Sequence, residues 1–96
     1  MIKFTNGTSI TNQQAAALIR REPYGLIAHM LIDAQGHRCA LGVLLGSTHG
    51  DSCPISVAEE SMVLCKRMVR TNNGFHGRPE ERREVMAQWF EKLPGE

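Results

Sequence analysis

The chain opens with an alternation of apolar and polar positions that is typical of a short strand. Ile2 and Phe4 are apolar, their neighbours are polar, and the turn-forming pair Asn6-Gly7 follows closely. Successive side chains of a strand point to opposite faces, so this alternation predicts a strand over residues 1–5 that ends in a turn.

The spacing of the apolar positions becomes helical after residue 10. The stretch Thr11–Gln14 has the residue types of a capping box, in which the first and fourth side chains each accept from the other's backbone N–H. The apolar residues that follow share one helical face: Ala15, Leu18 and Ile19. Because Pro23 cannot continue a helix, the pattern predicts a helix from residue 11 that stops near Arg21.

The next stretch supports two interpretations. In the first, residues 26–33 form a strand that turns at Asp33-Ala34-Gln35-Gly36 and returns over residues 37–41. In the second, Cys39 opens a buried helix that runs through Leu45 and ends at Gly46. We favour a short hairpin or irregular ribbon that leads into this short helix.

Gly42 lies in the middle of that short helix. A glycine costs about 1 kcal/mol there relative to alanine, so its presence needs a reason. We predict that another backbone element packs closely against the Cα of Gly42. Cys39 is predicted to be buried beside it and chemically quiet.

Two further helices are predicted in the second half of the chain. Ser56–Glu59 has the form of a second capping box, and its helix is expected to run to about Thr71, where Asn72-Asn73-Gly74 ends it. The last helix is expected to begin at Pro79. Its apolar residues form the clearest amphipathic stripe in the chain: Val85, Met86, Trp89, Phe90 and Leu93.

These elements predict one compact domain over residues 1–96, of the α+β class. The domain is predominantly helical, with three to four short helices and a small β-hairpin or ribbon. The expected core consists of large apolar residues from all the helices: Trp89, Phe90, Leu64, Met68, Leu18, Leu41 and Leu44.

Composition and charge change this picture little. Apolar residues make up 42% of the 96 positions, charged residues 22%, and the formal net charge is +1. A near-neutral chain differs from general nucleic-acid coats and membrane-surface binders, which carry an overall basic excess. No apolar run approaches the ~18 residues of a membrane helix, and the N-terminus lacks the apolar centre of a signal peptide. We therefore expect a cytoplasmic protein with no membrane partner.

Four residues suggest a metal site. His37, Cys39, His49 and Cys53 offer imidazole and thiolate groups, which are the ligands that zinc prefers. Their spacing is not that of a zinc finger or ribbon. Cysteine is also among the most frequently buried residue types, so we favour core thiols and predict no metal and no cofactor. Zinc binding stays open as an alternative.

The same loop also suggests a nucleophile. A helix that begins at Cys39 would lower the pKa of the thiol, and His29, His37 or His76 would be candidate bases. The chain has no nucleophile elbow, phosphate loop, dinucleotide fingerprint or H-E-x-x-H motif. Enzymatic activity is therefore the least supported class, and we predict no catalytic residues.

A resemblance adds a biological setting. The stretch "DAQGHRCALGVLLGS" and the later "TNNGFHGRPEERREVMAQWF" resemble a group of short uncharacterised proteins of bacteria and their phages, over roughly residues 24–93. Members of that group often have a tryptophan before the turn and an Asn-Asp pair after the third helix, where this chain has Tyr24 and Asn72-Asn73. The resemblance implies a fold and a setting but no mechanism. Its core signature here is Gly36, Cys39, Ala40, Leu41, Gly42 and Leu44.

A basic segment follows the third predicted helix. Lys66, Arg67 and Arg70 leave one side of that helix, and Arg82 and Arg83 begin the next one. Arginine and aromatic side chains in an adaptable loop are typical of binding hot spots. We predict that the segment from 67 to 83 binds a partner, with six main contributors: Arg67, Arg70, Asn73, Phe75, His76 and Arg78.

Two function classes remain open at this stage. The first is a small interaction protein of a phage or mobile element that binds a host protein and modulates or inhibits it, for example as an inhibitor of a defence system. The alternative is a zinc-bound or nucleotide- or phosphate-binding module that uses the His–Cys loop or the arginine cluster, with nucleic acid as a candidate partner.

Overall fold

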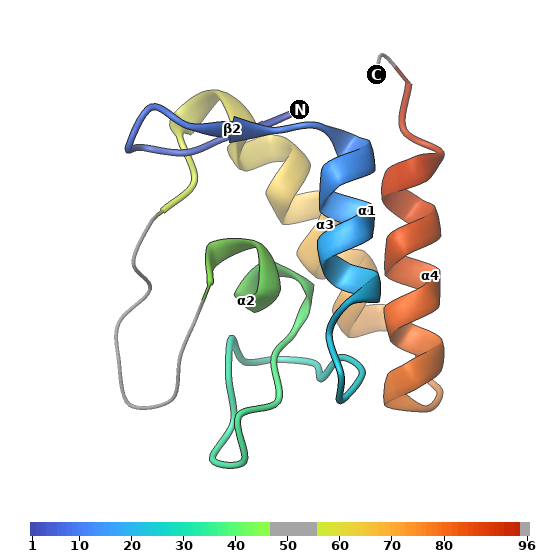
Figure 1. Ribbon diagram of the computed structural model, residues 1–96. Coiled ribbons are helices and arrows are strands. Elements are labelled where there is room, and N and C mark those ends of the chain that lie inside the picture. Colours follow the sequence, from blue (N-terminus) through green and yellow to red (C-terminus); the bar gives the residue numbers. More distant parts are fainter. Residues whose placement is uncertain (47–55, 95–96) are drawn as a thin grey trace.

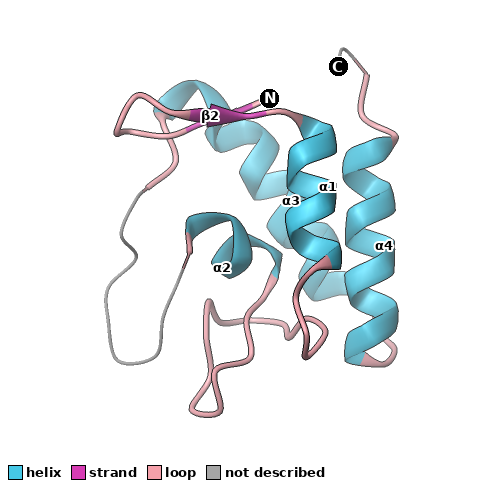
Figure 2. Ribbon diagram, in the orientation of Figure 1, coloured by secondary structure: helices cyan, strands magenta, loops and turns pink. Residues whose placement is uncertain are grey.

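Two of the helices stand side by side, a third lies behind them, and a shorter fourth one lies to their side (Figure 1). The computed structural model describes residues 1–46 and 56–94, and all statements below concern these residues. α1 (Asn12–Arg20) and α4 (Pro79–Glu91) run antiparallel, and α3 (Met62–Gly74) lies behind them. α2 (Ala40–Leu45) packs against α1 and α3. The α+β class with a predominance of helix is confirmed (Figure 2).

The predicted N-terminal strand and turn are confirmed, although the strand is shorter than predicted, and the strand has two neighbours that were not predicted. β1 (Ile2–Lys3) pairs with β2 (Ser9–Ile10) in antiparallel register. On its other side the N-terminal segment pairs with residues 56–58: the Thr5 N–H donates to the Ser56 carbonyl at 2.9 Å, and the Ala58 N–H donates to the Lys3 carbonyl at 2.8 Å. Gly46 therefore ends α2, whereas the next described residue, Ser56, pairs with the N-terminal segment.

This pairing explains why the second predicted capping box is wrong. Ser56 is extended and its hydroxyl lies 2.8 Å from that of Thr5, so it does not cap a helix. A 3₁₀ turn, η1 (Glu59–Ser61), comes first, and α3 starts at Met62. α3 also continues to Gly74, beyond the predicted end near Thr71. The first capping box, by contrast, is confirmed: Gln14 N–H donates to Thr11 Oγ1 at 3.0 Å, and Thr11 N–H donates to Gln14 Oε1 at 2.8 Å.

Of the two forms favoured for residues 26–41, the irregular ribbon is confirmed, and the hairpin with strands over residues 26–33 and 37–41 is wrong. This region is an irregular ribbon with only two isolated bridges, Leu26 with Arg38 and Ile32 with Arg38. His29 has a positive φ of 70°, which bends the chain away from an extended path. The turn at 33–36 is as predicted: Asp33 Oδ1 accepts from the N–H groups of Gln35 and His37 at 2.9 and 2.8 Å.

The alternative interpretation of the next residues is confirmed. Cys39 is buried and is the N-cap of α2, where its sulfur accepts from the Gly42 N–H at 3.4 Å. Gly46, with a φ of 68°, ends the helix. The ribbon passes directly over Gly42, because a Cβ built on Gly42 would lie 2.1 Å from the Leu31 carbonyl oxygen. The predicted close approach of another backbone is therefore confirmed.

The core lies where α1, α3 and α4 meet the hairpin and α2. Three of the predicted core residues are buried: Phe90, Met68 and Leu44. The other four are only half-buried and pack against the edge of the core: Leu18, Leu41, Leu64 and Trp89. Trp89 meets the Phe90 ring edge-on, with centroids 4.9 Å apart, so it covers the core and is not enclosed by it.

Arg20 joins α1 to α4 on the surface. Its guanidinium donates to Glu84 Oε1 and Glu91 Oε1, both at 2.8 Å. Hydrogen bonds from Arg20 lower the pKa of Glu84 and of Glu91 below their usual value of 4.5. A carboxyl group with a lowered pKa in the folded state stabilises the fold above its unfolded pKa, and this contribution is lost as the pH falls through the folded pKa.

We therefore expect Arg20→Gln to lower the melting temperature at pH 7 and to change it much less near pH 3. Thermal unfolding followed by circular dichroism at both pH values is the measurement. Arg21→Gln is the control, because in residues 1–46 and 56–94 the exposed Arg21 side chain makes no ion pair. An effect of Arg20→Gln that is equally large at both pH values would show that the ion pairs contribute nothing.

Candidate partner-binding surface

α3 and the loop after it carry an unbalanced positive charge. Residues 62–78 contain no Asp or Glu and four cationic side chains: Lys66, Arg67, Arg70 and Arg78. All four are exposed, and none makes an ion pair within the part of the chain that the structure describes. Glu84 of the following helix does not neutralise these cations, because it pairs with Arg20.

Arg82 and Arg83, in contrast, hold the fold together. The Arg82 guanidinium donates to three backbone carbonyls, those of Leu26 at 3.0 Å, Asn72 at 2.9 Å and Phe75 at 2.7 Å. Arg83 donates to the Glu22 carbonyl. These two arginines therefore join α4 to the ribbon and to the end of α3, and they are not available to a partner in the way that Arg67 and Arg70 are.

The six predicted binding residues divide into two groups. Arg67, Arg70, His76 and Arg78 have exposed side chains. Asn73 is half-buried, and its Oδ1 accepts from the His29 N–H at 2.9 Å, which holds the bend of the ribbon. Phe75 is also half-buried, beneath the Arg82 guanidinium at 5.7 Å from the ring centroid. Their contribution to binding stays a prediction, and the exposed group is the stronger candidate.

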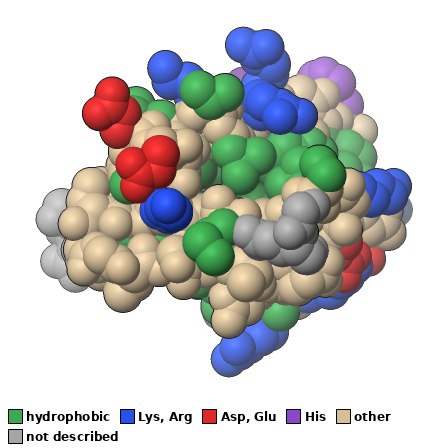
Figure 3. Space-filling view, turned by 90° about the horizontal axis from the view of Figure 1, so that it is seen from above, with side chains coloured by type: hydrophobic (Ala, Val, Ile, Leu, Met, Phe, Trp, Pro, Cys, Tyr) green, Lys and Arg blue, Asp and Glu red, His purple; other side chains and the backbone are tan. Residues whose placement is uncertain are grey.

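Figure 3 shows how apolar and basic side chains gather on one face. Hydrophobic side chains lie in a hollow there, and Lys or Arg side chains border it. On α3 itself two apolar residues stand out from the surface, because Val63 is 72% exposed and Met62 is 43% exposed. Val63, Arg67 and Arg70 are spaced i, i+4 and i+7, so they form one stripe along α3.

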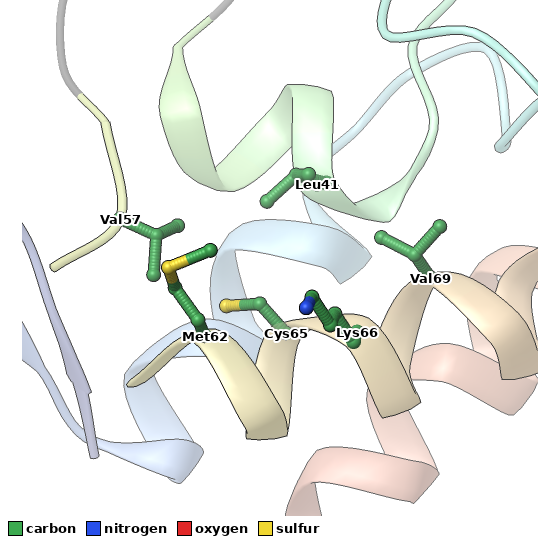
Figure 4. Close-up of a pocket in the computed structure, with 6 residues that line it drawn as sticks. All are labelled: Leu41, Val57, Met62, Cys65, Lys66 and Val69. Atoms are coloured by element: carbon green, nitrogen blue, oxygen red, sulfur yellow. The ribbon is translucent and has the colours of Figure 1, made fainter. Parts of the chain in front are cut away.

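A cavity of about 300 Å³ opens beside this stripe, between α3 and α2 (Figure 4). Leu41 points from α2 toward α3, where Cys65 and Val69 form the opposite wall, and Val57 and Met62 close one end. Among the described residues of its lining, Lys66 is the one with a charged side chain. Burial raises the pKa of the Cys65 thiol, so this cysteine is a poor nucleophile at neutral pH.

A second, smaller cavity continues the first. It measures about 180 Å³ and shares Leu41 and Val69 with the larger one. Its remaining lining comes mainly from the ribbon: His29, Met30, Leu31, Cys39 and Asn73. Sequence reasoning missed both cavities. The available signal was α3 itself, whose apolar positions cover more of the helix circumference than one buried stripe requires.

The His–Cys loop is only partly described. His37 Nδ1 lies 3.3 Å from Asp33 Oδ2, and its ring packs against Tyr24 with centroids 5.1 Å apart. Burial acts against the charged form of Asp33, but hydrogen bonds from the His37 and Gln35 N–H groups outweigh it and lower the pKa of this carboxyl. His49 and Cys53 lie outside the described residues, and within residues 1–46 and 56–94 no three His, Cys, Asp or Glu residues are grouped as metal ligands.

The helices of the described segments are all too short or too polar to cross a membrane. Comparisons with protein-family models, with curated proteins and with solved structures find no match to this chain. The resemblance to short bacterial and phage proteins therefore stays a prediction. The candidate site is defined by its geometry alone: a basic stripe on α3, exposed apolar residues beside it, and a groove between α3 and α2.

Proposed function

We propose that this chain is a small protein-binding domain and that α3 presents the binding surface. The observation that carries the proposal is a set of exposed cations in residues 62–78, which make no ion pair with the described residues and lie beside exposed apolar side chains. Arginine is a preferred residue of protein interfaces because its guanidinium donates several hydrogen bonds in a fixed plane. Arg67 and Arg70 therefore suit an acidic protein surface.

The apolar residues favour a protein partner over a purely ionic ligand. Val63 lies on the same stripe as the two arginines and exposes most of its surface. A cluster of exposed apolar residues that is bordered by charge marks an interaction site more often than a random surface. A partner that covers Val63 would desolvate the neighbouring arginines and strengthen their hydrogen bonds.

The biological setting of the proposal comes from the sequence resemblance. We infer that the partner is a host protein, and that the chain belongs to a phage or mobile element and modulates or inhibits that partner. Occupying part of a protein's surface is sufficient for inhibition, so a small domain without a catalytic site can serve this function.

Phosphate groups are the second candidate ligand. Four exposed cations that make no ion pair with the described residues also suit a nucleic-acid backbone. Salt separates the two ligands, since nucleic-acid binding releases counterions and weakens steeply as salt rises. The contribution of Val63 to binding also separates the two ligands, because an apolar side chain contributes to a protein interface and little to phosphate contacts.

The test is a charge reversal on α3. We expect the double variant Arg67→Glu, Arg70→Glu to bind its partner at least about 10-fold more weakly, which corresponds to about 1.4 kcal/mol. The partner is captured from bacterial lysate with the unmodified chain, identified by mass spectrometry, purified and titrated against each variant.

The matched control is Lys3→Glu, Lys92→Glu. It changes the net charge equally, on exposed residues of β1 and of the segment after α4. A partner that binds both double variants with the affinity of the unmodified chain would contradict the proposal. Equal weakening by both would point to a general charge effect, and capture of nucleic acid alone would favour the phosphate alternative.

A further inference from the structure

The two cavities between α3 and α2 form one groove, because both are lined by Leu41 and Val69. Its α3 side is a single stripe of the helix with spacing i, i+3, i+4, i+7 and i+11: Met62, Cys65, Lys66, Val69 and Asn73. At 1.5 Å per residue this stripe is about 17 Å long, which matches about three turns of a second helix. The groove thus has the length of a short helical segment.

The lining of the larger cavity is unsuited to a small polar molecule. Small-molecule sites combine an apolar surface with several convergent polar groups that fix the ligand's orientation. The described walls are aliphatic side chains, a methionine and a thiol, and Lys66 is the one charged group among these residues. Such a surface suits the apolar side chains of a protein segment, which enter from one face of a helix.

Methionines mark both parts of the groove. Met62 lines the larger cavity and is 43% exposed, and Met30 lines the smaller cavity and is 53% exposed. Methionine is flexible and polarizable, so it adapts to the side chains of a partner, as it does in grooves that bind amphipathic helices. These side chains lose exposed apolar surface when a partner segment covers them.

The charges along the groove are one-sided. Lys66 lines the α3 side, and Arg67 and Arg70 lie on the neighbouring stripe of the same helix. The opposite wall, α2, consists of Ala40–Leu45 and has no charged side chain. A helix in the groove would therefore gain most from carboxylates along the flank that faces α3.

We propose that the groove binds an amphipathic helical segment of a partner protein, about three turns long, with apolar residues on one face and Asp or Glu along one flank. The proposal rests on the protein-binding function inferred above and assigns it a partner class. Lys66 is inferred to contact the acidic flank, and Met62, Leu41 and Val69 to contact the apolar face.

The probe is a fluorescein-labelled 15-residue helical peptide with leucines at positions 2, 5, 9 and 12 and glutamates along one flank. Its matched control has lysines in place of the glutamates. By fluorescence anisotropy we expect the acidic peptide to bind the unmodified chain at least fivefold more tightly than the basic one. Lys66→Glu should reverse this preference, whereas Lys92→Glu, an equal charge change outside the groove, should leave it unchanged.

A second pair of variants tests the apolar contact. Met62→Gln is expected to lower the affinity for the acidic peptide at least threefold. Tyr24→Gln changes an exposed side chain outside the groove and is expected to leave this affinity unchanged. Equal binding of both peptides, or no response to Lys66→Glu and Met62→Gln, would overturn the proposal. A dimer of the chain that these variants dissociate in sedimentation would also overturn it, because a second copy would then occupy the groove.

Titration of the natural partner against these variants distinguishes failure of the groove proposal from failure of the protein-binding function on which it rests. If the partner is lost with Arg67→Glu, Arg70→Glu but retained at full affinity with Lys66→Glu and Met62→Gln, then α3 binds outside the groove and only the proposal for the groove fails. If none of these variants weakens binding of the partner, the proposed protein-binding function of α3 fails as well.

Discussion

Gly42→Ala is expected to lower the free energy of unfolding by at least about 3 kcal/mol, because the new methyl group has no space. Its Cβ would lie 2.1 Å from the Leu31 carbonyl oxygen, and backbone cannot rotate away as a side chain can. The same carbonyl accepts from the Cys39 N–H at 3.3 Å. Moving the ribbon to admit the methyl group would therefore also break a contact at the start of α2.

The measurement is urea unfolding followed by circular dichroism. Gly74→Ala is the matched control, since Gly74 is also helical but a Cβ there meets nothing within 4 Å. Alanine is the better helix former, so Gly74→Ala should be neutral or slightly stabilising. If both variants unfold at the same urea concentration, the ribbon yields to the methyl group and the close approach is not a constraint.

Gly42 also shows what the sequence could predict. A glycine in a buried helical stretch had no local advantage, so a tertiary neighbour was the remaining explanation, and the structure confirms it. The first capping box, the 33–36 turn and the last helix were predictable for a different reason. In each of them the decisive contacts lie within a few residues of one another, as between Thr11 and Gln14.

The ribbon could not be predicted because its partners are remote in sequence. Asn72 is buried, its Nδ2 donates to the Ile27 carbonyl at 3.0 Å, and its Oδ1 accepts from the Ala40 N–H at 3.3 Å. Asn72 and Asn73 looked like a helix stop, which is a local role. Because their side chains are bonded to the ribbon, the helix continues past them and the ribbon needs no strand pairing.

The candidate site was predictable in part. Charge along the chain located the basic segment, but it could not separate arginines that bind backbone from arginines that face solvent. Arg82 and Arg70 look alike in the sequence, and only the packing of α4 against the ribbon distinguishes them. The additional apolar positions of α3 indicated a second contact surface on this helix. The groove itself depends on how α2 lies across α3, which these positions do not specify.

Arg82→Ala is expected to cost about 3 kcal/mol of stability, because a charged donor is removed from three backbone carbonyls at once. The loss also removes the guanidinium from the Phe75 ring. Arg82→Lys should recover less than half of the stability, since one ammonium group cannot reproduce a planar fork that reaches three carbonyls. Urea unfolding is the measurement, and Arg78→Ala, an exposed arginine at the start of the same helix, is the control.

Local opening should accompany this loss. Without Arg82 the ribbon keeps Asn72, Asn73 and the hydrogen bond from the Leu26 N–H to the Pro79 carbonyl, but it loses its side-chain connection to α4. The amide protons of Ile27 and His29 should therefore exchange faster than those of α1. His29, Met30 and Leu31 line the smaller cavity. A looser ribbon would therefore weaken binding of the acidic helical peptide, although none of the residues that contact the peptide is changed. Unchanged exchange at Ile27 and His29 in Arg82→Ala would show that Asn72, Asn73 and the Leu26–Pro79 backbone hydrogen bond hold the ribbon without Arg82.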